Sequence, residues 1–305
     1  MIEYILKPGY IILSIFVLSG MYIHFRGKVR YPLARQLTSH TNLTAPYNTF
    51  VYLFSAVPNT PILDVERFPE LRVLRDNWET IRNEARTLYE QGDIKAADKY
   101  NDAGFNSFFR TGWTRFYLKW YDDFLPSARQ LCPKTVELLR STPSVNAAMF
   151  ASLPPGANLP THRDPYAGSL RYHLGLITPN SERCRIYIDG TPHYWKDGED
   201  IIFDETYVHS AVNGTNDPRI ILFCDIQRPL RSRVADTINR FVSNHLIKAS
   251  ATQNTPFEKV GVLNRLFGYI YHIRIVGKRL KRWNRNFYYA VKYSLLGGLV
   301  YLIFL

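Results

Sequence analysis

The stretch VNAAMFASLPPGANLPTHRDPYAGSLRYHLGLI, residues 145–177, marks the point where the pattern of the chain changes. Its two ends, residues 145–153 and 169–177, are apolar runs, and proline, glycine and asparagine separate them, which predicts two strands joined by turns. Five more short runs of this kind follow: CRIYID (184–189), HYW (193–195), DIIFD (200–204), VHSAV (208–212) and RIILFCDI (219–226). Seven or eight short strands with regular turns predict a two-sheet jelly roll, whose mouth can hold a metal ion.

Three side chains in this region are of the types that bind iron in non-haem sites. His162 and Asp164 lie two residues apart, so an extended backbone points both to one face. His209 follows the strand-like run DIIFDETYV. Two imidazoles and one carboxylate can fill one face of a six-coordinate iron and leave the other positions for a cosubstrate and oxygen. Each residue alone could be an ordinary turn or core group, but together they predict a metal centre.

Arg219 stands at the start of the last apolar run and indicates the cosubstrate. A guanidinium pairs bidentately with a carboxylate, so Arg219 could bind the far carboxylate of a dicarboxylate such as 2-oxoglutarate while the keto-acid end chelates the metal. Arg171 and His173 have strand spacing and could line the same pocket. The alternatives are a solvated strand end for Arg219 and a packed core position for His173.

Composition limits the other functions. The 305 residues carry 38 Lys and Arg against 26 Asp and Glu, a net charge of +12. The charge gathers beside the hydrophobic ends and not along the central region, which disfavours nucleic acid as a partner. Three cysteines, Cys132, Cys184 and Cys224, lack the spacing of a zinc site and predict structural thiols in a reducing compartment.

Both ends of the chain have the pattern of membrane segments. The run from Gly9 to Phe25 contains no charged residue and, with the residues before it, reaches the length needed to cross a bilayer. Its basic residues lie mostly behind it, unlike those of a cleaved signal peptide: Arg26, Lys28, Arg30 and Arg35. We therefore expect a retained membrane segment over residues 1–25.

Residues 287–305 form a second hydrophobic run with one charge, Lys292, and a basic, aromatic-rich stretch precedes it. Basic clusters on the domain side of both segments place the domain in the cytoplasm by the positive-inside rule. Two buried core helices are the alternative. The charge-free part of the C-terminal run, residues 293–305, is short and could only dip into the bilayer.

Between the two ends we expect one catalytic domain over residues 65–230, with a helical part (65–144) and the jelly roll (145–230). Its predicted class is mainly β with flanking helices (α+β). Residues 68–92 have apolar side chains at helical spacing and end at Gly92, and residues 132–143 predict a shorter helix with Pro133 in its first turn. Residues 26–64 are predicted as a juxtamembrane linker, and residues 231–286 as a basic, amphipathic, membrane-proximal region.

Four motifs carry a family resemblance: LPPGANLPTHRD (153–164), LRYHLGLITP (170–179), WKDGEDIIFDETYVHSAVN (195–213) and PRIILFCDIQRP (218–229). They resemble the aspartyl/asparaginyl β-hydroxylase family of Fe(II)/2-oxoglutarate oxygenases, and the similarity covers roughly residues 65–230. Within this family the chain most resembles bacterial lipid A 2-hydroxylases. The resemblance implies a double-stranded β-helix of the cupin type, Fe(II), 2-oxoglutarate and O2 as cofactors, and hydroxylation with release of succinate and CO2.

The resemblance also implies roles for single residues. His162 and His209 match the two iron-binding histidines, and the cosubstrate-binding positions of the family correspond to Arg219, Arg171 and His173. Animal peptide-hydroxylating members have a glycine at the position of Asp164, which here supplies a third, carboxylate ligand. Glu205 matches an acid that could support the ligands, or could be a solvated turn charge.

The implied substrate is lipid A or its precursor, hydroxylated at the 2-position of a secondary acyl chain at the cytoplasmic side of a bacterial inner membrane. Anionic membrane lipids are the other expected partners, because basic groups near the bilayer meet lipid phosphates. Two alternatives stay open at this point. One is a peptidyl aspartyl/asparaginyl β-hydroxylase, and the other is a membrane-tethered jelly roll that binds a ligand without catalysis.

Overall fold

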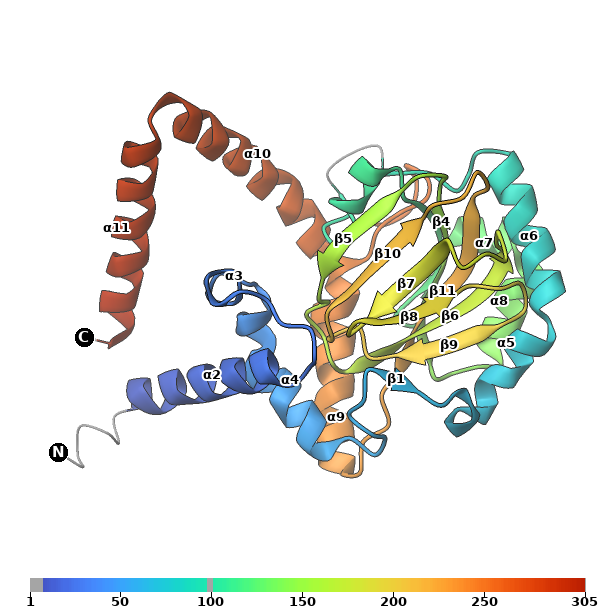
Figure 1. The fold of residues 1–305 in the computed structure, drawn as a ribbon, viewed down its shortest axis with the longest axis horizontal. Coiled ribbons are helices and arrows are strands. Elements are labelled where there is room, and N and C mark those ends of the chain that lie inside the picture. The colour runs from blue at the N-terminus through green and yellow to red at the C-terminus, as the bar shows by residue number, and fades with distance from the viewer. Residues whose placement is uncertain (1–7, 98–100, 305) are drawn as a thin grey trace.

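Two antiparallel sheets form the body of the protein, and the computed structural model describes residues 8–97 and 101–304 (Figure 1). The larger sheet has the strand order β1-β9-β6-β11-β4-β2-β3 and the smaller one β5-β10-β7-β8. The strands are β1 (Ile62–Leu63), β2 (Thr114–Trp120), β3 (Asp123–Phe124), β4 (Val145–Leu153), β5 (Asn158–His162), β6 (Ser169–Ile177), β7 (Cys184–Ile188), β8 (Thr191–Tyr194), β9 (Asp200–Phe203), β10 (His209–Asn213) and β11 (Arg219–Gln227). This arrangement confirms the predicted jelly roll with flanking helices.

Burial differs between the two sheets. Strands β4, β6 and β11 of the larger sheet are buried along nearly their whole length, because helices cover the face that points away from the smaller sheet. In contrast, β7 and β10 alternate between buried and half-buried residues. The covering helices lie together, away from both chain termini (Figure 1): α5 (Arg72–Asp76), α6 (Trp78–Glu90), α7 (Pro126–Leu131) and α8 (Pro133–Arg140). All three cysteines are buried free thiols.

The helical part of the domain differs from its prediction in two places. Residues 65–144 also contain strands β2 and β3, which the sequence analysis missed. The single helix expected over residues 68–92 is interrupted at Asn77, where the backbone leaves the helical region and the side-chain amide donates to the carbonyl of Val73. The interruption separates α5 from α6, and two 3-10 turns, η1 (Val65–Arg67) and η2 (Pro69–Leu71), precede α5. Gly92, with φ +77°, ends α6 as predicted.

The segment 26–64, predicted as a linker, instead folds against the sheets. It contains α3 (Leu33–Leu37) and α4 (Thr41–Phe54). Arg26 is buried in an ion pair with Asp204 and lies over the rings of Tyr52 and Tyr207, at 3.7 and 4.0 Å from their centroids. Arg26 is therefore a structural group and not a free charge at the membrane surface. These contacts fix the end of the N-terminal helix to the jelly roll.

Helices α2 (Pro8–Phe25) and α10 (Val262–Trp283) leave the jelly roll on the same side, and α11 (Arg285–Phe304) follows at the outer end of α10 (Figure 1). Helix α2 is the one helix in the described residues that is long and apolar enough to cross a membrane, and only 17% of it is buried. Helix α11 covers most of the predicted C-terminal segment, and its insertion into a membrane stays a prediction. Residues 1–7 and 305, the outer ends of the two predicted segments, lie outside the described residues.

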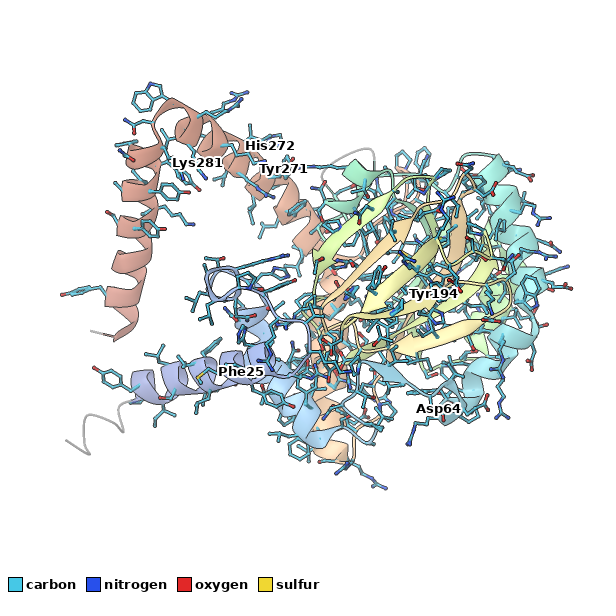
Figure 2. All side chains as sticks on the ribbon, in the orientation of Figure 1. Phe25, Asp64, Tyr194, Tyr271, His272 and Lys281 are labelled. Carbon is cyan, nitrogen blue, oxygen red and sulfur yellow. The ribbon has the colours of Figure 1, made fainter. Side chains whose placement is uncertain are left out.

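The remaining C-terminal elements connect β11 to α11. They are α9 (Arg233–Val242), the π-helical turn η4 (Ser243–Ile247), η5 (Lys248–Ser250) and α10 (Val262–Trp283); a further 3-10 turn, η3 (Phe108–Thr111), precedes β2. Figure 2 shows Phe25 where α2 meets the body of the protein, and Tyr271, His272 and Lys281 along α10. Arg110 of η3 donates to the hydroxyl of Tyr271, so the middle of α10 is attached beside η3.

Candidate active site

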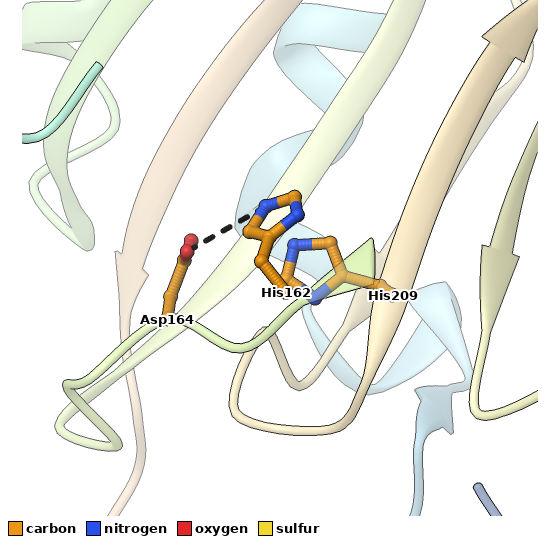
Figure 3. Close-up of side chains that lie close together, drawn as sticks. All are labelled: His162, Asp164 and His209. Atoms are coloured by element: carbon orange, nitrogen blue, oxygen red, sulfur yellow. Dashed lines mark ion pairs between the residues drawn. The ribbon is translucent and has the colours of Figure 1, made fainter. Parts of the chain in front are cut away.

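The smaller sheet brings the two predicted histidines together. His162 ends β5 and His209 begins β10, and the two residues are direct partners in the antiparallel pairing. Their ring centroids lie 4.1 Å apart. Asp164 follows β5, with its Oδ1 3.8 Å from Nε2 of His162 (Figure 3). One ligand atom from each of the three residues lies within 4.8 Å of the others, and no second group of this kind occurs in the described part of the chain. Such a cluster has the size of a single-ion site.

The hydrogen bonds of the two histidines leave the correct nitrogen free for a metal. Nδ1 of His162 lies 2.7 Å from the carbonyl of Pro160, and Nδ1 of His209 lies 2.9 Å from the carbonyl of Tyr207. A carbonyl only accepts, so Nδ1 is the protonated nitrogen in both rings, and Nε2 keeps its lone pair. Burial, followed by the nearby His162, lowers the pKa of His209 to about 3, so the ring is neutral at physiological pH. The donor set therefore fits a divalent metal.

Arg171 holds the third ligand in place. Its guanidinium donates to Asp164 Oδ2 at 2.9 Å and also pairs with Glu205 and with Asp225. Burial acts to raise the pKa of Asp164, but the charge of Arg171 and the neighbouring histidines keep that pKa below its usual value. Burial raises the pKa of both Glu205 and Asp225. The lowered pKa of Asp164 favours its ionised form, which a carboxylate needs in order to bind a metal.

These contacts bear on two expectations. Arg171 lines the same cavity as the predicted ligands, but three carboxylates surround its guanidinium, so its geometry favours orienting Asp164 over binding a cosubstrate. Glu205 is a buried group and not a solvated turn charge. Its backbone carbonyl also accepts from the amide of Asp164 at 2.9 Å, so Glu205 supports Asp164 through both its side chain and its backbone.

Arg219 has the opposite character, because it is a buried cation without a counter-charge. It is 2% exposed, and in the described residues no carboxylate lies within salt-bridge distance and no hydrogen bond reaches its guanidinium. The guanidinium lies over the ring of Trp195, at 4.4 Å from the centroid. Burial lowers its pKa to about 10, so it remains charged at neutral pH. A buried, unpaired cation in a cavity fits a carboxylate ligand.

Two further groups in the cavity have free hydrogen-bonding capacity. Both ring nitrogens of His173 are buried without a partner in the described residues, and the same holds for Nε1 of Trp195. Burial, and then the charges of Arg171 and Arg219, lower the pKa of His173 well below its usual value, so it is neutral. The sequence analysis gave the Trp195 side chain no role and placed the residue in a strand, whereas β8 ends one residue earlier, at Tyr194. The contact of Trp195 with Arg219 arises only in three dimensions.

All six predicted site residues line one cavity with an empty volume of about 480 Å³: His162, Asp164, Arg171, His173, His209 and Arg219. The rest of the lining is mostly aromatic and aliphatic. Phe108 lies beside His162, with ring centroids 4.7 Å apart, and Phe223 lies between His173 and Arg171. The cavity thus combines one polar wall with apolar surfaces that exclude water.

The profile of the aspartyl/asparaginyl β-hydroxylase family matches residues 75–229. The chain belongs to this family. It is 30% identical, over 77% of its own length and 76% of the relative's, to the ornithine lipid ester-linked acyl 2-hydroxylase of Rhizobium tropici. It is also 28% identical to the human aspartate β-hydroxylase domain-containing protein 2, and here the match covers 64% of this chain and 54% of the human one.

Solved structures with a similar fold include a prolyl-4-hydroxylase from Pseudomonas putida, with a TM-score of 0.33 and 16% identity over 51% of this chain and 88% of that one. A cupin domain of a transcriptional regulator from Enterobacter cloacae has a TM-score of 0.27 and 15% identity, covering 38% of this chain and 98% of that one. Membership of the β-hydroxylase family makes this protein a dioxygenase-type hydroxylase.

Proposed function

We propose that this β-hydroxylase family member binds Fe(II) through His162, Asp164 and His209 and uses 2-oxoglutarate and O2 to hydroxylate the 2-position of an acyl chain in a membrane lipid. Succinate and CO2 are the other products. The observation that carries the proposal is the convergence of three ligand atoms within 4.8 Å in a cavity that also holds the unpaired, buried Arg219.

The protein's part in the reaction is binding, orientation and exclusion of water. When bound, the iron supplies oxygen activation, which couples oxidative decarboxylation of 2-oxoglutarate to insertion of an oxygen atom into a C–H bond. Arg219 binds the far carboxylate of the cosubstrate, and the unpartnered nitrogens of His173 and Trp195 offer hydrogen bonds beside it. Arg171 keeps Asp164 oriented.

The wall of the cavity supports an apolar substrate. Its lining includes Phe105, Phe108, Leu159 and Ile186, and these side chains offer no charge for a polar substrate. An acyl chain needs no polar partner along its length, and the apolar wall keeps water away from the reacting carbon. The name of the Rhizobium tropici relative, an acyl 2-hydroxylase, supports the same substrate class.

Location supports a lipid substrate in a bilayer. Helix α2 is apolar and largely exposed, and the basic residues of α10 can meet anionic lipid phosphates. We place the protein at a bacterial inner membrane with the catalytic domain on the cytoplasmic side. Lipid A or its precursor is the substrate we propose first, and ornithine lipid is the second candidate because the Rhizobium tropici relative is named for it.

A peptidyl β-hydroxylase is the competing function, since the human aspartyl/asparaginyl β-hydroxylase is 26% identical over 52% of this chain and 21% of its own length. Purified protein would be incubated with Fe(II) and 2-oxoglutarate and with lipid A, ornithine lipid or Asp- and Asn-containing peptides. Mass spectrometry should detect a gain of one oxygen atom on a fatty acyl chain, and none with the His209→Ala control. Peptide hydroxylation without any lipid product would overturn the proposal.

A further inference from the structure

A second hollow lies outside the active-site cavity, between α2 and the short helix α3. Its empty volume is about 890 Å³, and apolar side chains make most of its surface. The residues that matter here are Phe16, Val17, Gly20, Met21, Leu33 and Leu37. We call this hollow the α2–α3 groove. A Cβ at Gly20 would meet nothing closer than Asn42 Oδ1 at 3.7 Å, so the absence of a side chain there deepens the groove without being forced by the backbone packing.

The groove ends next to the chain segment that carries a metal ligand. Arg35 of α3 donates to the carbonyl of Thr161 at 2.7 Å, and Arg163 donates to Gln36 Oε1 at 3.2 Å. Thr161 and Arg163 are the two neighbours of His162. One end of the groove is thus attached to the chain on both sides of His162, and the other end runs along α2.

Three polar residues stand at the active-site end of the groove. Gln36 and Asn42 satisfy each other, because the Gln36 amide donates to Asn42 Oδ1 and the Asn42 amide donates to the Gln36 carbonyl. His24 is 8% exposed, and its Nδ1 has no hydrogen-bond partner in the described residues. The rest of the groove offers no hydrogen bonds. A peptide there would leave its backbone groups unpaired, whereas a hydrocarbon chain would not.

We infer that the α2–α3 groove holds an acyl chain of the lipid substrate and guides it from the bilayer to the metal site, an inference that rests on the proposed lipid hydroxylase function. The groove lies on the one described helix that is apolar enough to cross a membrane. Hydrocarbon can enter it sideways from the bilayer without passing through water. The polar end at His24, Gln36 and Asn42 then matches the change from acyl chain to ester or hydroxyl groups.

Filling the groove tests this inference. Gly20→Leu and Leu37→Trp place side chains in it, and Leu18→Trp is the matched control, because Leu18 is 65% exposed on α2 and does not line the groove. Each protein would be placed in phosphatidylethanolamine–phosphatidylglycerol vesicles containing lipid A or ornithine lipid. We expect kcat/KM for the lipid to fall at least about tenfold in both groove variants, since even two displaced methylene contacts have that effect. The control should have the same kcat/KM for the lipid as wild type. All variants should turn over 2-oxoglutarate at the wild-type rate when no lipid is present.

Photolabelling of the wild-type protein gives a readout that does not need activity. The probe is a phosphatidylglycerol with a diazirine in its acyl chain, and labelled residues would be mapped by mass spectrometry. Labels concentrated at Met21 and Leu37 would support acyl-chain binding in the groove. Uniform labelling of all faces of α2, including Leu18, would overturn it, as would cross-links between two protein copies in the groove. If wild type hydroxylates lipid and the groove variants are as active as Leu18→Trp, the role of the groove is refuted and the proposed function is not. No lipid hydroxylation by wild type would refute the proposed function instead.

Discussion

Replacing Arg219 by leucine removes a buried guanidinium that has no carboxylate partner in the described residues, and we expect two opposite effects. Cosubstrate binding should weaken, because the far carboxylate of 2-oxoglutarate would be buried without its cation. The protein without cosubstrate should become more stable, because an uncompensated charge is expensive to bury. A residue that serves only the fold would not produce this combination.

The magnitudes follow from the site. Burial lowers the pKa of Arg219 to about 10. At roughly 1.4 kcal/mol per pKa unit this is a penalty of roughly 3 kcal/mol, fully present at pH 7 because the group is protonated in both the folded and unfolded states. Loss of the cation–π contact with Trp195 offsets about 1–2 kcal/mol of the gain. The remainder should raise Tm by about 2–8 °C.

The loss in binding should be larger. Truncating one partner of a buried, charged pair typically costs about 2–5 kcal/mol, which corresponds to a roughly 30- to 4,000-fold higher Kd for 2-oxoglutarate. Isothermal titration calorimetry on Mn(II)-loaded protein without oxygen would measure this Kd, and metal affinity would be titrated separately. Arg219→Lys keeps the charge but loses the planar fork and should lie between wild type and Arg219→Leu.

Arg183→Leu is the matched control, because Arg183 is an exposed arginine outside the cavity. It should change neither the Kd for 2-oxoglutarate nor the stability of the cosubstrate-free protein. An unchanged Kd in Arg219→Leu would remove Arg219 from the cosubstrate site. Weaker binding of 2-oxoglutarate together with a lower Tm would show that the guanidinium has a structural partner. Its burial would then not destabilise the cosubstrate-free protein.

Three other outcomes follow from the same contacts. His209→Ala should abolish Fe(II) binding in a metal titration, whereas Asp164→Ala should weaken it less because two imidazoles remain; equal abolition would show that the site depends fully on three ligands. Arg26→Met should lower the free energy of unfolding by about 2–4 kcal/mol in a denaturant titration, because it removes one of the two arginines that pair with the buried Asp204. Lys28→Met is the control and should have little effect, because Lys28 is exposed. Deleting the residues after Asn286 should weaken flotation with anionic vesicles but leave metal binding intact; a truncated protein that binds no metal would place that helix in the core.

The strands that the sequence predicted best are long runs in which most residues are apolar. The predicted runs 145–153 and 169–177 coincide with β4 and β6, which are buried on both faces. Strand β2 was missed because its sequence, TRFYLKW, contains two charged residues that look exposed. In the structure Arg115 pairs with Asp102, and Lys119 donates to the carbonyl of Val145. Both partners are distant in sequence, so local pattern could not predict this burial.

The site shows the same division. Residue type and place in the strand pattern predicted that His162, Asp164 and His209 form one cluster, and the structure brings the three side chains together. The contacts that orient them were not predictable, since an arginine such as Arg171 looks the same in sequence whether it binds a cosubstrate or a protein carboxylate. The prediction of a linker over residues 26–64 was wrong for a related reason. A polar segment between two apolar regions resembles a linker until the partner of Arg26 is known, and that partner lies 178 residues away.

That partner also connects α2 to the proposed metal site. Asp204 receives Arg26 from the end of α2, and the next residue, Glu205, receives Arg171, which holds Asp164. The backbone carbonyl of Glu205 accepts from the amide of Asp164 as well. Two adjacent residues of one buried turn therefore bear both the attachment of α2 and the orientation of a metal ligand. Because that turn is packed and its charges are paired, the position of α2 relative to the jelly roll and the geometry of the His162–Asp164–His209 cluster cannot vary independently.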